Sequence, residues 1–208
     1  DAGGLKLAEA QLTLKSGSLA VNDSNYNLHY ASSAAGLVGQ NVSVVFTGNL
    51  VNRDETDDSL NRLTADDYKG GDIADNVVFA NAVLDNSGKT TAPNLVIGSS
   101  YDANSTAIDQ SVGVQSIDLC DSAESVTVTS GHQLTLVGDG GDLITGGSEN
   151  LHVDVGTEGS VGTLRLGSSA VETSGGTLDA ALNVQNAGSS VVVEAGSFTV
   201  TGEVGNEG

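Results

Sequence analysis

Short runs of alternating apolar and polar residues recur along the whole chain. A period of two is the pattern of a β-strand with one buried face. Clusters of Gly, Asn, Asp and Ser separate the runs, as expected of turns between strands. The chain is therefore predicted to be all-β. The clearest runs are Leu5-Lys6-Leu7, Leu12-Thr13-Leu14, Val126-Thr127-Val128, Leu134-Thr135-Leu136, Leu151 to Val155, Leu164-Arg165-Leu166, Val191-Val192-Val193 and Phe198-Thr199-Val200.

A Gly-x-apolar-x-apolar unit repeats within this pattern. It begins at Gly17, Gly162, Gly176 and Gly196 and, with one added residue, at Gly131. The step from Gly176 to Gly196 is about twenty residues, which is within the range of solenoid repeats, although the step from Gly162 to Gly176 is shorter. One such turn cannot bury its own apolar face, but stacked turns can. We therefore predict a parallel β-solenoid that spans residues 1–208 as a single domain of roughly nine turns, about 45 Å long.

An antiparallel β-sandwich of short strands is the alternative fold. Aromatic residues are only 3% of the chain and there is one proline, whereas a sandwich core normally relies on large aromatic side chains. A core of Val, Leu, Ile and Ala suits a thin, repetitive interior, which favours the solenoid. Eight side chains are predicted to point inward: Leu134, Leu136, Leu164, Leu166, Leu178, Val193, Phe198 and Val200.

The segment 53–76 breaks the alternation. It is polar and acidic, and Leu60, Leu63 and Tyr68 could form one face of a short helix. We interpret it as a loop inserted between turns, with its backbone outside the stack. Loops carry function more often than the scaffold that holds them.

The charge and composition narrow the class of partner. The net charge is −20, from 27 acidic and 7 basic residues, which argues against binding to nucleic acid or to anionic lipid surfaces. No run of about 18 apolar residues occurs, so no transmembrane helix and no membrane insertion are predicted. The single cysteine, Cys120, rules out an internal disulfide. The chain begins at Asp1 and contains no Met, and we interpret it as a piece of a longer exported protein.

Candidate metal ligands are present but lack the expected spacing. The turn from Gly138 to Leu143 resembles one copy of a Gly- and Asp-rich calcium repeat, with Asp139 and Asp142 as its carboxylates. Calcium needs carboxylates from several repeats, so we predict no resident cofactor and, at most, weak millimolar calcium binding. The acidic residues between Asp54 and Asp67 do not match an EF-hand loop. No metal site is predicted from the distant histidines His29, His132 and His152.

The sequence also shows no evident set of catalytic residues. Alternation places Asp118 and Cys120 on the face opposite Ile117 and Leu119, and no histidine lies near this thiol to activate it. Polysaccharide-cleaving solenoids need clustered carboxylates beside a basic residue. The basic residues available near carboxylates are few: Arg53, Arg62 and Arg165. We therefore predict no enzyme activity and assign no catalytic, cofactor-binding or metal residue.

Two stretches resemble a known family. The run from Val126 to Gly138 and the run Gly162 to Gly167 with the following Gly175-Gly176-Thr177-Leu178 turn resemble the turns of bacterial autotransporter passenger domains. The resemblance covers residues 116–208 well and the first half loosely. It implies a right-handed parallel β-helix displayed outside a Gram-negative cell after type V secretion. The barrel, the linker helix and the protease domain of that family have no counterpart here.

These observations favour a non-catalytic extracellular scaffold, an adhesin-like passenger segment whose loops contact another cell, a host surface or a matrix. The partners implied are surface proteins or glycans. A polysaccharide-binding or polysaccharide-cleaving β-helix is the second hypothesis. A subunit of an extracellular filament or surface layer, formed by end-to-end self-association, is the third, because neither terminus looks like a capping turn.

Overall fold

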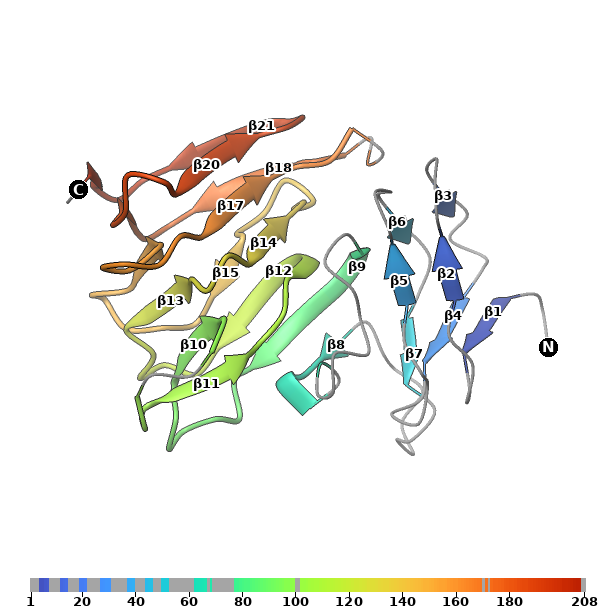
Figure 1. The fold of residues 1–208 in the computed structure, drawn as a ribbon, viewed down its shortest axis with the longest axis horizontal. Coiled ribbons are helices and arrows are strands. Elements are labelled where there is room, and N and C mark those ends of the chain that lie inside the picture. Colours follow the sequence, from blue (N-terminus) through green and yellow to red (C-terminus); the bar gives the residue numbers. More distant parts are fainter. Residues whose placement is uncertain are drawn as a thin grey trace.

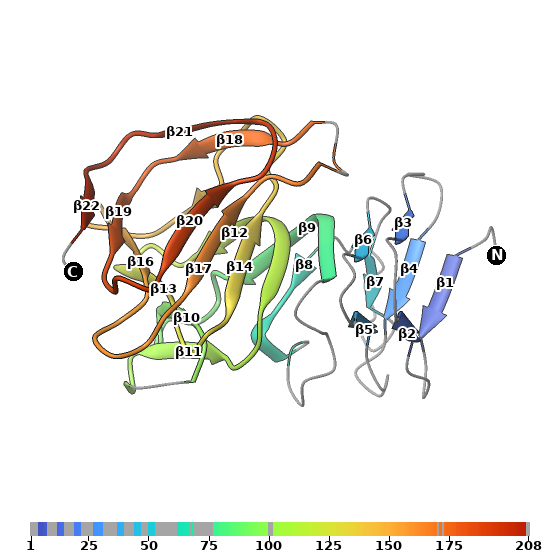
Figure 2. The ribbon, with the colours of Figure 1, turned by 45° about the horizontal axis from the view of Figure 1, so that its top comes forward.

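Parallel strand pairing defines the architecture. In a computed structural model of the chain, all pairings between the described strands are parallel. Most of them join successive turns of the chain, whereas β10 pairs with β11, which directly follows it in the sequence. The structure describes residues 62–66, 68, 77–99, 102–169, 171 and 173–205, together with the backbone of seven strands between residues 4 and 52 and of Asn206. Figures 1 and 2 show the strands stacked in layers from β1 to β22. The predicted parallel β-solenoid is confirmed, and the antiparallel sandwich is excluded.

The first wall of the solenoid is a six-stranded sheet. Its order is β11-β10-β13-β16-β19-β22. The strands from β10 to β19 each place at least one apolar residue in the interior, because the pleat turns alternate side chains toward it. The strands are β10 (Asn94–Ile97), β11 (Ser105–Ile108), β13 (Ser125–Val128), β16 (His152–Val155), β19 (Ala181–Val184) and β22 (Val204–Asn206).

The second wall runs through both halves of the chain. Its order is β20-β17-β14-β12-β9-β6-β3. Among the described residues, seven strands follow one another along this ladder. The strands are β3 (Leu19–Val21), β6 (Val44–Phe46), β9 (Val77–Asn86), β12 (Val112–Leu119), β14 (Gln133–Leu136), β17 (Thr163–Leu166) and β20 (Ser190–Val193).

The long strands β9 and β12 continue from the second wall into a third wall. Their register shifts between Val114 and Ser116, and beyond this irregularity β9 pairs with β8 (Arg62–Leu63) and β12 pairs with β15 (Ile144–Thr145). Figure 2 shows the curved course of these two strands. Higher turns complete this wall with β18 (Gly175–Leu178) and β21 (Ser197–Val200), which the isolated bridge from Asp142 to Thr177 links to the turn below.

Two further sheets lie in the N-terminal part. One has the order β1-β4-β7, and β2 pairs with β5 in the other. These strands are β1 (Gly4–Leu7), β2 (Leu12–Leu14), β4 (Asn27–Tyr30), β5 (Leu37–Gly39) and β7 (Leu50–Asn52).

The core consists of apolar columns that run perpendicular to the strands. Leu134, Leu136, Leu164, Leu166 and Leu178 are all buried, as predicted. Phe198 and Val200 are half-buried and pack against the same core. Burial of each Leu or Val contributes roughly 1.5–3 kcal/mol, so stacking of turns is the main source of stability.

Val193 was predicted to be inside, and this was wrong: its side chain is 59% exposed. It pairs with the buried Leu166, but β20 is the last strand of the second wall. Alternation gives the direction of a side chain, whereas burial also requires a further layer above it.

Part of the segment 53–76 packs against the core. Leu63, Ala65 and Tyr68 are buried in the main apolar cluster, and Gln110 donates a hydrogen bond to the carbonyl of Tyr68. The prediction that this segment lies outside the stack is therefore wrong for these three residues. Arg62 and Leu63 form an edge strand because Leu63 extends the column of Leu84 on β9. Arg53 and the acidic residues from Asp54 to Asp58, with Asp67, lie outside the described residues.

Candidate functional site

A group of charged side chains that contact one another lies on the outer face of the third wall. Leu84, Ile117 and Ile144 form an inward column across β9, β12 and β15. The next residue in each strand therefore points outward, which places Asp85, Asp118 and Thr145 in one register. We call these three residues, with Arg62, the third-wall cluster.

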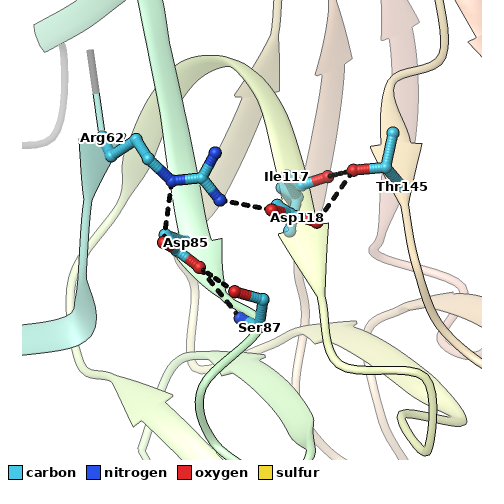
Figure 3. Close-up of polar contacts among 6 residues, drawn as sticks. All are labelled: Arg62, Asp85, Ser87, Ile117, Asp118 and Thr145. Atoms are coloured by element: carbon cyan, nitrogen blue, oxygen red, sulfur yellow. Dashed lines mark hydrogen bonds and ion pairs between the residues drawn. The ribbon is translucent and has the colours of Figure 1, made fainter. Parts of the chain in front are cut away.

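Arg62 joins the two carboxylates of the cluster. Its Nε donates to Asp85 Oδ2 at 2.8 Å, and its Nη2 donates to Asp118 Oδ2. Figure 3 shows the guanidinium reaching from β8 across β9 to β12. Two carboxylates directly opposite each other on neighbouring strands would repel. The guanidinium provides fixed donors that can satisfy both at once.

Neighbouring hydroxyl and amide groups hold the other carboxylate oxygens. Ser87 donates to Asp85 Oδ1 from its backbone N–H at 3.0 Å and from its hydroxyl at 2.6 Å. Thr145 donates its hydroxyl to Asp118 Oδ1 at 3.0 Å. Both carboxylates are therefore bound on both oxygens by groups of the chain itself.

The contacts between Arg62 and Asp85 favour the charged forms of these two side chains. Burial raises the pKa of Asp85, but the hydrogen bonds from Arg62 and Ser87 outweigh it and lower the pKa to about 2. The hydrogen bond to Asp85 raises the pKa of Arg62 above its ordinary value, against the effect of burial and together with Asp118. A general acid at neutral pH needs a raised carboxyl pKa. Asp85 has the opposite shift, so the cluster is suited to holding three strands together.

A separate cleft of about 630 Å³ lies where the third wall turns into the first. Three successive turns of the chain line it, through residues 146–151, 179–181 and 202–203. Its carboxylates, Glu149, Asp179 and Glu203, are exposed, and Asp179 accepts a hydrogen bond from the hydroxyl of Thr201. No Arg, Lys or His is among the lining residues. The combination of carboxylates and a basic residue in one cleft, which a polysaccharide-cleaving site needs, is therefore not found here.

The Gly138 turn is a corner of the solenoid. Gly138 has φ +61°, and a Cβ there would lie 2.0 Å from the carbonyl oxygen of Gly175 in the next turn. Asp139 accepts hydrogen bonds from the Gln115 side chain at 2.8 Å and from the Gly141 N–H at 3.1 Å. Asp142 forms its backbone bridge to Thr177. Across the described part of the chain, no three His, Cys, Asp or Glu side chains are grouped so as to hold a metal ion.

The described histidines have local partners. His132 Nε2 lies 3.2 Å from Asp109 Oδ1, and His152 Nε2 lies 3.4 Å from Asp154 Oδ2. His152 points outward between the buried Leu151 and Val153, as alternation predicts. The side chain of His29 lies outside the described residues.

Cys120 is buried in the main apolar cluster, so its expected position on the face of Asp118 was wrong. β12 ends at Leu119, and alternation no longer applies beyond that residue. Its Sγ lies 3.5 Å from the Ser122 hydroxyl and 3.9 Å from the Lys89 carbonyl oxygen.

Sequence reasoning missed the third-wall cluster. Alternation indicated that Asp118 points outward, and Arg62 was recognised as one of few basic residues. The register that brings Arg62 to Asp85 and Asp118 depends on pairing across 23 and 56 positions, which no local pattern encodes. The other described arginine, Arg165, pairs with Glu194 at 2.7 Å on the second wall.

The chain matches no protein-family model, no curated protein and no solved structure. Within the described residues, no helix has the length and apolar character needed to cross a membrane.

Proposed function

We propose that this chain is a non-catalytic extracellular surface scaffold, an adhesin-like passenger segment whose outer faces and corner loops contact another cell, a host surface or a matrix. The observation that carries the proposal is the third-wall cluster. Its one cation and two carboxylates join three layers of the stack, and both oxygens of each carboxylate accept hydrogen bonds from groups of the chain itself.

The solenoid itself supports this role. A parallel ladder of seven strands forms a long rod with repeated outer faces, which separates a contact surface from its point of attachment. The net charge of −20 opposes non-specific association between such rods. The resemblance to autotransporter passenger domains, with display outside a Gram-negative cell, agrees with the same role.

Adhesion of coated particles tests the proposal. Fluorescent beads carrying the purified chain should bind to epithelial cells or to immobilised matrix proteins and glycans, and beads carrying an unrelated protein of similar net charge should not. Binding no greater than that of the control beads, over the whole panel, would contradict the contact role.

A substrate panel separates the scaffold from the polysaccharide-cleaving alternative. The purified chain should release no product from neutral or acidic polysaccharides. Turnover that Asp85→Asn or Asp118→Asn abolishes, while Asp179→Asn leaves it intact, would assign catalysis to the third-wall cluster and overturn the proposal.

A further inference from the structure

The outer face of the second wall carries a small apolar cluster that is separate from the core inside the stack. In β9, the residues on either side of Val78 point inward and belong to the main cluster. Val78 and Ala80 lie on the opposite face, where they form a second cluster with Val137. Val78 is 8% exposed, Ala80 3% and Val137 0%, and the half-buried Val171 packs against them. We call these four residues the outer seam.

The outer seam passes over a strand. Val78 and Ala80 belong to β9 and Val137 directly follows β14, whereas β12 lies between these two strands in the wall. Gly113 of β12 makes the contact possible, because a Cβ at this position would lie 2.8 Å from Val78 Cγ2. The absence of a side chain at Gly113 leaves that space to Val78. The seam therefore joins two layers that do not pair with each other.

Val171 adds a further turn of the chain to the seam. It lies between β17 and β18, and local hydrogen bonds fix its backbone. Its N–H donates to the Ser168 carbonyl at 3.0 Å, and its own carbonyl accepts from the Ser174 N–H at 3.2 Å. The Ser174 hydroxyl donates to the Ser168 carbonyl and accepts from the Ser168 N–H, both at 3.2 Å. These bonds hold Val171 against the outer face of the wall.

Glu194 connects the same corner to the next layer. This residue directly follows β20. Its Oε1 accepts hydrogen bonds from the Ser169 hydroxyl at 3.1 Å and from the Ser169 N–H at 3.4 Å. Its Oε2 accepts a bond from Arg165 Nη1 of β17 at 2.7 Å. The corner that contains Ser169 and Val171 is thus attached to the end of β20 on one side and to the outer seam on the other.

The columns inside the stack act between neighbouring layers. Leu134, Leu164 and Val191, for example, lie opposite one another in adjacent strands of the second wall. A solenoid held only by such contacts behaves as a one-dimensional array, in which single repeats can open from an end. A contact that passes over a layer opposes this opening, because a layer then cannot separate from its neighbour without breaking a more distant contact as well.

We propose that the outer seam and the contact between Ser169 and Glu194 form a clamp that makes the layers from β9 to β20 open as one unit instead of one at a time. The seam ties the turn that contains Val171 to β9, and Glu194 ties the same turn to β20. This clamp is independent of the proposed function, because it concerns how the stack opens and not what its surface contacts.

Hydrogen exchange of the intact chain, at increasing urea concentrations below the unfolding midpoint, tests the proposal. In the wild type, the amides of β9, β17 and β20 should exchange through one opening, with the same dependence on urea. Val137→Ala removes the middle of the seam, and the amides of β17 and β20 should then exchange roughly tenfold faster than those of β9. Val171→Ala, at the edge of the seam, should give a smaller difference in the same direction.

Val155→Ala is the matched control. Val155 of β16 is also 0% exposed, but it lies in the main cluster, opposite Val128 and Val184 of the adjacent strands. This variant loses the same methyl groups and should speed exchange in all three strands equally. Glu194→Gln should release β20 while β17 still exchanges with β9. A wild type whose strands exchange independently would overturn the proposal, and so would a Val137→Ala variant whose strands still exchange together.

Discussion

Asp118 lies directly opposite Asp85 in the pairing of β12 with β9, and the guanidinium of Arg62 is hydrogen-bonded to both carboxylates. The two aspartates come from successive turns of the solenoid, and Arg62 comes from the edge strand below them. A single cation thus converts a like-charge repulsion into a connection between three layers. This connection joins the segment that contains Arg62 to the stack.

Replacement of Arg62 should weaken the stack. Arg62→Gln removes the charge and leaves Asp85 and Asp118 facing each other, and we expect the free energy of unfolding to fall by roughly 1–2 kcal/mol, a value reduced for the partial exposure of the site. Urea denaturation measures it. Lys89→Gln is the control, because Lys89 Nζ lies 4.0 Å from Asp66 and both side chains are exposed, and it should change stability by less than about 0.5 kcal/mol. Equal effects of the two substitutions would show that the cluster adds no stability.

Acid should weaken the interaction between Arg62 and Asp85, because protonation removes the charge of the carboxylate. The pKa of Asp85 is about 2 in the folded chain and 3.8 ordinarily, so unfolding takes up a proton between these values. The stabilisation is complete above about pH 4 and is lost as the pH falls through about 2. The urea midpoint of the wild type should therefore fall more steeply than that of Asp85→Asn between about pH 4 and pH 2. Parallel curves for the two proteins would rule out this contribution of Asp85.

The apolar columns should dominate stability. Leu164 is 0% exposed between Leu134 and Val191, and Leu164→Ala should cost about 2–5 kcal/mol. Val193→Ala, in the same ladder but largely exposed, should cost less than about 0.5 kcal/mol. Urea unfolding of both variants gives the comparison. A small effect at Leu164 would contradict the stacked core.

Corner glycines should be required for close approach between turns. Gly138 and Gly131 both have positive φ, but a Cβ at Gly138 would meet the Gly175 carbonyl oxygen at 2.0 Å, and a Cβ at Gly131 would meet nothing within 4 Å. Gly131→Ala should therefore cost only the backbone strain, about 1–2 kcal/mol. Gly138→Ala should cost distinctly more, because one turn must move away from the next. Thermal unfolding of the two variants compares them, and equal midpoints would contradict the tight corner.

The sequence predicted the strands and their inward residues well, because both depend on local alternation. It predicted the repeat length less well, and the structure explains why. The units at Gly131 and Gly162 precede β14 and β17 of the second wall, where Leu134 pairs with Leu164. The units at Gly176 and Gly196 belong to β18 and β21 of the third wall, where Leu178 pairs with Val200. The short step from Gly162 to Gly176 is therefore a step between walls, and only steps within one wall measure a turn.

The other differences between the sequence-based predictions and the structure arise at the ends of strands and where distant turns meet. Val193 is exposed because, among the described strands, β20 is the outermost of the ladder, and Cys120 is buried because β12 ends one residue before it. Tyr68 is buried because a neighbouring turn supplies the surface that covers it. Each depends on contacts between distant residues, as does the third-wall cluster, and alternation contains no information about such contacts.

Display outside the cell is the central claim of the proposed function, and antibody labelling of the intact source cells tests it most directly. An antibody raised against the folded chain should label intact cells as strongly as permeabilised cells, and brief treatment of intact cells with an external protease should remove the signal. Labelling that appears only after permeabilisation, and that survives the protease, would contradict the claim.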